Sequence, residues 1–256
     1  FGKIEDECHN SPKNPTDFVR FTPTNSPKTL YVPVDELAYH ETGLYNSLID
    51  WNGIPPSHSL YSKDIFEVDS NKEIFNYTGR VPVLLLSDGV RSIRSETFKD
   101  CHSLAKVILP SSIKNISKRT FFNCQNLEEV VLPESLEFID EEAFMNCPKL
   151  KIVNFHPELK IIGKRSFKNC GFTEIELYGA IIIDTQAFEN NINLEKIWIG
   201  DNIKFINSQA FLNCSKLHTF QIDDSDEEII IKDDIFDNCN LLVNVDIPED
   251  ITIKTD

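Results

Sequence analysis

A phenylalanine followed three positions later by a cysteine recurs along the chain, and this spacing restricts the fold more than any other feature. The pair stands in FKDC at Phe98, FFNC at Phe121, FMNC at Phe144, FKNC at Phe167, FLNC at Phe211 and FDNC at Phe236, with FENN at Phe188. Successive phenylalanines are 23, 23, 23, 21, 23 and 25 residues apart. A unit this short cannot bury its apolar face alone, so the copies must stack as a solenoid.

The remainder of each unit repeats as well. Its apolar and small positions in the third unit are Leu127, Val130, Leu132, Pro133, Leu136, Ile139, Ala143, Phe144, Asn146, Cys147 and Leu150. The Val-x-Leu alternation predicts a short strand with one buried face. The stretch from Ile139 to Phe144 has room for about one turn of helix.

At these residues the chain resembles the BspA-type, or Treponema-type, leucine-rich repeats, whose unit is similar to LxxIxLPxxIxxIgxxAFxNCxxL. The resemblance covers residues 81–253 and implies an α/β solenoid with short parallel strands. Members of this family are mostly surface or secreted proteins of bacteria and parasitic protists, and some are adhesins. The resemblance therefore implies protein binding and brings no catalytic residues with it. The chain departs from the pattern at Asn191, which replaces a cysteine, in a shorter fourth unit and in an acidic insertion in the sixth.

Two regions are expected. Residues 81–256 form about seven repeat units of 21–25 residues, while residues 1–80 do not repeat and form an N-terminal cap region. A solenoid must cover its first apolar edge, so we expect a small mixed cap there. A resemblance to the opening of a BTB-like or Skp1-like domain is the alternative. The expected cap elements are strands at Phe18–Phe21, Leu30–Val34, Ile65–Val68 and Ile74–Tyr77 and a helix at Asp35–Trp51.

Composition narrows the partner classes. The chain has 256 residues and a net charge of −16, with its basic residues scattered, which argues against nucleic acid as a partner. No apolar run approaches the length of a membrane span, so no membrane insertion is expected. The chain begins at Phe1 without a secretory signal, which suggests a mature or shortened product.

Six of the seven cysteines occupy one repeat position. We expect them to be free, buried thiols that pack as small hydrophobic groups, with disulfide pairing between neighbouring units as the alternative. The chain has no CxxC motif and no Cys/His cluster, so neither a metal nor another cofactor is expected. The asparagine before each cysteine is expected to form a ladder, its amide bonding the backbone of the next unit's turn.

The binding surface should lie where the repeat leaves residues free to vary. The residue between the two buried positions of each strand faces outward, on the predicted concave side of the sheet. Trp198 stands at such a position and suits a binding hot spot. The predicted partner-binding residues are Ile108, Val131, Ile152, Asn154, Glu174, Glu176, Tyr178 and Trp198. The alternative is that the aliphatic residues reflect β-propensity alone.

The sequence thus predicts a protein-binding module and not an enzyme, because no catalytic motif occurs. The first hypothesis is a surface or secreted adhesion protein that binds a host or matrix protein. The alternatives are an intracellular or cytoskeletal scaffold with reduced thiols, and a structural subunit of an assembly. No further unit follows Val243–Ile247, so this edge is expected to continue into more chain or to self-associate.

Overall fold

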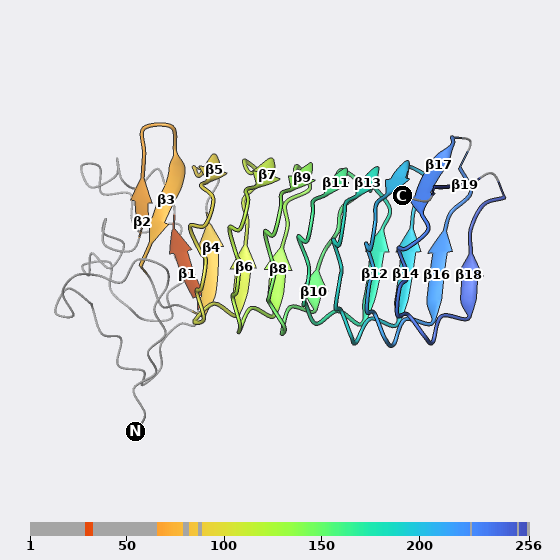
Figure 1. Cartoon of the computed structure of the whole chain (residues 1–256). Helices are drawn as coiled ribbons and strands as arrows, with labels where there is room; N and C mark the ends of the chain where they lie inside the picture. The colour runs from red at the N-terminus through yellow and green to blue at the C-terminus, as the bar shows by residue number, and fades with distance from the viewer. Residues whose placement is uncertain are drawn as a thin grey trace, which may run out of the picture.

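The computed structural model describes residues 29–32, 66–78, 82–86, 89–225, 227–249 and 251–254. Within these ranges the chain winds through successive coils, each with a strand in a first row and a strand in a second row (Figure 1). The first-row strands are β4 (Val83–Leu86), β6 (Lys106–Ile108), β8 (Glu129–Val131), β10 (Ile152–Val153), β12 (Glu174–Leu177), β14 (Lys196–Ile199), β16 (Thr219–Ile222) and β18 (Asn244–Asp246).

Both rows form parallel sheets in which strands pair with the equivalent strands of neighbouring coils, except that β10 and β12 are not paired. The first row, which also includes β1 (Thr29–Val32), therefore comprises a sheet ordered β1-β4-β6-β8-β10 and another ordered β12-β14-β16-β18. The second row is ordered β19-β17-β15-β13-β11-β9-β7. Its strands are β7 (Asn115–Ile116), β9 (Phe138–Ile139), β11 (Ile161–Ile162), β13 (Ile182–Ile183), β15 (Phe205–Ile206), β17 (Ile229–Lys232) and β19 (Ile251–Lys254).

The N-terminal strands meet the first coils. The strand expected at Leu30–Val34 is observed as β1 (Thr29–Val32), parallel to β4. Those expected at Ile65–Val68 and Ile74–Tyr77 form an antiparallel pair, and the second of them also pairs with the start of the second row. These elements are β2 (Phe66–Val68), β3 (Glu73–Tyr77) and β5 (Ser92–Ile93). The helix at Asp35–Trp51 and the strand at Phe18–Phe21 lie outside the described residues, so the mixed cap stays a prediction.

The helical part of the expected α/β solenoid is wrong for the described residues, which contain strands and turns and no helix. On the third side of six coils two residues, four positions apart, adopt left-handed backbone with φ between 54° and 64°, and the coil of Phe236 has Asn238 alone. One left-handed residue per turn interrupts any α-helix. The pairs are Glu96 and Asp100, Arg119 and Asn123, Glu142 and Asn146, Arg165 and Asn169, Gln186 and Asn190, and Gln209 and Asn213.

The phenylalanines form the expected column inside the coils. Phe98, Phe121, Phe144 and Phe167 stack with ring centroids 5.1 Å apart and planes within 7° of parallel. All four side chains are fully buried. The column continues less regularly through Phe188 and Phe211, whose centroids are 5.7 Å apart.

The cysteines have a second role besides packing. Each free thiol donates to the carbonyl oxygen of the phenylalanine one coil earlier, as from Cys147 Sγ to Phe121 O at 3.1 Å. The same bond occurs at Cys124, Cys170, Cys214 and Cys239. Five free thiols confirm the prediction at these positions, whereas Cys101 is disulfide-bonded and the prediction is wrong there.

Asn191 shows why this position needs a donor. It is fully buried where the pattern has a cysteine, and its Nδ2 donates to Phe167 O and to Phe188 O, both at 2.8 Å. A buried carbonyl without a donor costs about 1–3 kcal/mol. The amide therefore replaces the thiol, but its Oδ1 has no hydrogen-bond partner.

The asparagine ladder is confirmed, but its expected backbone acceptor is wrong. The side-chain amide of Asn169 donates to Oδ1 of Asn146 at 2.6 Å, and that of Asn213 donates to Oδ1 of Asn190 at 2.7 Å. Asn123 donates likewise to Asp100. Asparagine and aspartate tolerate left-handed backbone better than most residues, which explains their place in the turn.

Asn191→Cys should raise the free energy of unfolding by about 1 kcal/mol, because a thiol bonds the carbonyl of Phe167 without leaving a buried oxygen unpaired. Urea unfolding followed by circular dichroism measures the change. The matched control, Cys147→Asn, puts the same amide into a thiol site and should destabilise. A loss of stability in Asn191→Cys would contradict the assigned role of this position.

The repeat thiols should be inert in the native protein. Burial raises the pKa of Cys124 and of Cys170 well above the usual range, so the reactive thiolate is scarce. Alkylation of these two residues should be at least about a hundredfold slower in the folded chain than in urea. Mass spectrometry of labelled peptides measures both rates, and equal rates would show that the thiols are accessible.

Candidate functional site

The outward side of the first-row strands is the surface on which the sequence placed the partner-binding residues. We call it the first-row face. Strand alternation turns Ile175, Leu177, Ile197 and Ile199 into the core and their neighbours outward. Glu176, Trp198 and Gln221 are register partners across β12, β14 and β16. The backbone therefore holds these side chains in one line.

Trp198 is half-buried on this face, and the side chain of Lys196 lies beside its ring. The Lys196 ammonium lies 5.7 Å from the centre of a Trp198 ring, a cation–π distance. The same ammonium is 2.8 Å from a carboxylate oxygen of Glu174. That hydrogen bond, together with the charge of Glu174, raises the pKa of Lys196. Trp198 is thus an aromatic surface with few alternative positions.

Tyr178 extends the aromatic surface just beyond β12. Its side chain is 45% exposed. Partial burial, and then the charge and hydrogen bond of Glu176, raise the pKa of the phenol hydroxyl. On the next coil Gly200 lets the chains approach closely, because a Cβ there would lie 2.4 Å from Tyr178 O. A tyrosine and a tryptophan therefore lie on neighbouring coils beside two carboxylates.

The aliphatic part of the predicted site lies along β6, β8 and β10. Ile108 and Val131 are register partners and half-buried, and Ile152 is 60% exposed. Lys106 and Glu129 form an ion pair of 2.7 Å beside them. The two first-row sheets meet between β10 and β12, so the predicted residues lie on both sides of a sheet junction.

Asn154 is exposed near this junction, but its amide is already used. Its Oδ1 accepts from Leu132 N at 2.7 Å and its Nδ2 donates to Leu132 O at 3.0 Å. His156 Nε2 also bonds Leu132 O, at 2.9 Å. The side-chain amide of Asn154 thereby bonds both backbone groups of Leu132, as a neighbouring strand would. A partner contact by Asn154 stays a prediction, but the residue has a packing role that the sequence did not suggest.

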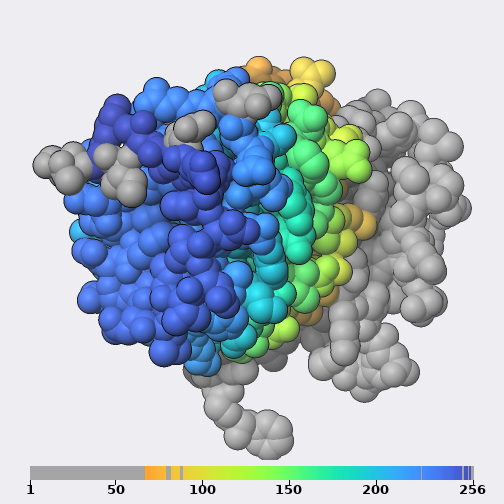
Figure 2. All heavy atoms as spheres, turned by 90° about the vertical axis from the view of Figure 1, so that its right-hand side faces the viewer, coloured from red at the N-terminus to blue at the C-terminus, as the bar shows by residue number. Residues whose placement is uncertain are grey.

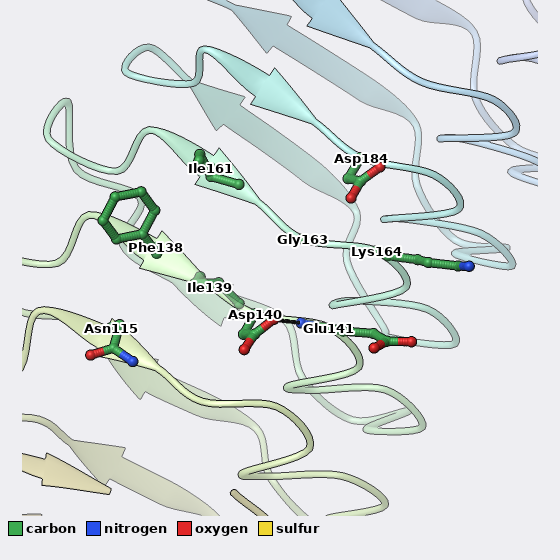
Figure 3. Close-up of a pocket in the computed structure, with 9 residues that line it drawn as sticks. All are labelled: Asn115, Phe138, Ile139, Asp140, Glu141, Ile161, Gly163, Lys164 and Asp184. Carbon is green, nitrogen blue, oxygen red and sulfur yellow. Dashed lines mark hydrogen bonds between the residues drawn. The ribbon is translucent and has the colours of Figure 1, made fainter. Parts of the chain in front are cut away.

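The sequence reasoning missed a second apolar surface, on the outward side of the second row. Phe138 and Phe205 are 39% and 40% exposed there, with Ile161 and Ile182 half-buried between them. A groove of about 620 Å³ lies beside Phe138 and Ile161, where Gly163 leaves a gap between Asp140 and Asp184 (Figure 3). In the sequence, this surface could have been predicted from the residue directly before the buried isoleucine of each second-row strand.

The described residues offer no metal-binding cluster of histidine, cysteine, aspartate or glutamate side chains. In the same ranges, no helix combines the length and hydropathy of a membrane span. The first-row face presents Trp198 and Tyr178 with charged neighbours.

Comparison with known proteins agrees with this architecture. Residues 69–182 and 181–256 match the family described as BspA type leucine-rich repeat region, in six copies. A leucine-rich repeat protein from Bacteroides ovatus is 30% identical, with a TM-score of 0.57, over 65% of this chain and 43% of that one. The T. pallidum leucine-rich repeat protein is 22% identical, with a TM-score of 0.53, over 75% and 84% of the two chains.

No curated protein matches the chain. The chain spans less than half of the B. ovatus protein, and the likeness to the T. pallidum protein concerns the fold alone. The family match, in contrast, covers well over half of the sequence. The chain therefore belongs to the BspA-type leucine-rich repeat family.

Proposed function

We propose that the chain is a recognition module that binds another protein on its first-row face, with Trp198 as the anchor. The repeat family and the solenoid fold support a protein-interaction role in general. The observation that carries the specific proposal is the position of Trp198, half-buried on a paired strand with Lys196 beside its ring. Tryptophan is among the residues that most often dominate binding energy.

The surroundings of Trp198 suit a particular kind of partner. Glu174, Glu176 and Asp223 give this part of the face an acidic border, and Glu174 is already paired with Lys196. Tyr178 adds an exposed ring with a hydroxyl. A partner that offers an apolar side chain flanked by arginine or lysine would complement this surface. Ile152, Val131 and Ile108 would extend the contact onto the neighbouring first-row sheet.

We further propose an extracellular or cell-surface location and an adhesion role. The disulfide at Cys101 supports this location, because disulfides persist mainly in oxidising compartments. An intracellular scaffold is the second candidate, supported by the five repeat cysteines that remain free. A structural subunit of an assembly is the third candidate.

Trp198→Ala should weaken binding to immobilised matrix or cell-surface proteins by about 30-fold or more, since a hot-spot truncation costs about 2 kcal/mol or more. Biolayer interferometry with each ligand measures the affinity. Phe122→Ala is the matched control, because Phe122 is a half-buried ring with the Arg119 guanidinium 5.5 Å from its centre, on the third side of the coil.

The proposal requires that Trp198→Ala lowers the free energy of unfolding no more than Phe122→Ala does. If the two variants bind a ligand of the parent chain with equal affinity, Trp198 is not part of the binding site. A collapse of stability in Trp198→Ala alone would show that the ring is a packing residue.

Intact mass of the protein from its natural source tests the compartment. After denaturing alkylation without reductant, a secreted protein should keep the Cys101 disulfide and carry alkyl groups on the other repeat cysteines. Peptide mapping without reduction identifies the disulfide. Alkylation of all seven cysteines before reduction would favour the intracellular scaffold instead.

A further inference from the structure

An apolar stripe crosses the second row, away from the proposed binding face. It consists of the outward residues of four adjacent strands, Phe138, Ile161, Ile182 and Phe205, which are register partners in turn. The two phenylalanines are 39% and 40% exposed. At a strand spacing of about 4.8 Å the stripe is about 14 Å long. Nothing in the repeat requires large apolar groups at these outward positions.

The four residues from Phe138 to Phe205 read the same in both directions, Phe-Ile-Ile-Phe, whereas the row continues to Asn115 at one end and to the half-buried Ile230 at the other. A two-fold interface brings the same patch of two copies together, so each residue must suit its mate across the axis. An axis that runs between Ile161 and Ile182, parallel to the strands, would place Phe138 against Phe205 of the second copy. The same operation places Ile161 against Ile182. Aromatic pairs and aliphatic pairs then meet without mismatch.

The charges beside the stripe favour this antiparallel arrangement. Each coil contributes a five-residue segment to this side of the solenoid, and the formal charge of the segment changes sign from one coil to the next. The charges are −3 from Glu137, Asp140 and Glu141, +2 from Lys160 and Lys164, −1 from Asp184 and +1 from Lys204. The antiparallel operation sets 137–141 against 204–208 and 160–164 against 181–185, which have opposite signs. A parallel pairing would set each segment against the same segment of the second copy, so that like charges would face each other.

The whole chain carries a charge of −16, which opposes self-association through most of its surface. On the four segments beside the stripe the formal charges nearly cancel. Lys204 is paired with Glu227 within its own chain, at 2.5 Å, in an exposed ion pair. Such pairs contribute little, typically up to about 1 kcal/mol, so Lys204 can exchange its partner for Glu137 of a second copy.

We propose that this stripe is the interface of an antiparallel homodimer. The patch is smaller than a standard interface, so the dimer dissociates at roughly 10–100 µM. The first-row faces of both copies remain uncovered, because they belong to different sheets from the stripe. The dimer would therefore present two binding faces to a surface with repeated partners.

Sedimentation velocity of the 256-residue chain, over roughly 1–500 µM at physiological salt, tests for the dimer. The expected result is a shift from monomer to dimer across this range. Phe138→Ser with Phe205→Ser should weaken association at least about tenfold. Ile192→Ser, an apolar change at a more exposed position elsewhere, should not. A monomer at every concentration, or a dimer indifferent to the double change, overturns the proposal; the latter would point to the exposed last coil.

A charge exchange tests the antiparallel register itself. Glu137→Lys alone and Lys204→Glu alone should each weaken the homodimer, because like charges then face each other across the axis. An equimolar mixture of the two variants should form a heterodimer, and the double variant should recover self-association. If neither the mixture nor the double variant recovers association, this register is wrong even if dimers form. Because the side chains of Glu137 and Lys204 are half-exposed or exposed in the parent chain, these changes should leave the fold intact.

Discussion

The bond between each buried phenylalanine carbonyl and the donor one coil later governs the rest of the structure. The stacked rings fill the interior at 5.1 Å spacing, and the carbonyls of Phe98, Phe188 and Phe211 accept from the backbone N–H three residues later. A thiol, or the amide of Asn191, adds a donor from the next coil. One residue pair thereby provides both the apolar contact and the polar pairing, and it recurs once in each coil.

Because this pair fixes the coils, the outward positions of both strand rows are free to differ. On the first row they carry Trp198, Tyr178 and their carboxylate neighbours. On the second row they carry the Phe-Ile-Ile-Phe stripe. The two surfaces lie on different sheets, so recognition and self-association would not compete. Weak dimerisation would then raise the avidity of a modest binding face without any change in its contacts.

The periodic features were predictable from the sequence, since the Phe column, the buried strand positions and the side of Trp198 all follow from spacing. The absence of helix was not, because Glu96, Arg119 and Gln186 adopt left-handed backbone without a glycine to indicate it. The donor role of the cysteines was hidden because a buried thiol also packs as a small apolar group. Asn154 gave no sign that its amide would pair with Leu132.

Amide hydrogen exchange of the isolated chain tests the central role of this column most directly. The amides of Phe121, Phe144 and Phe167 are buried and donate across coils at 2.8 Å. They should exchange only through global unfolding, with a free energy equal to that measured in urea. Exchange of these amides at the rate of exposed turn residues, while the strands stay protected, would show that the sheets and not the Phe-Cys column hold the coils together.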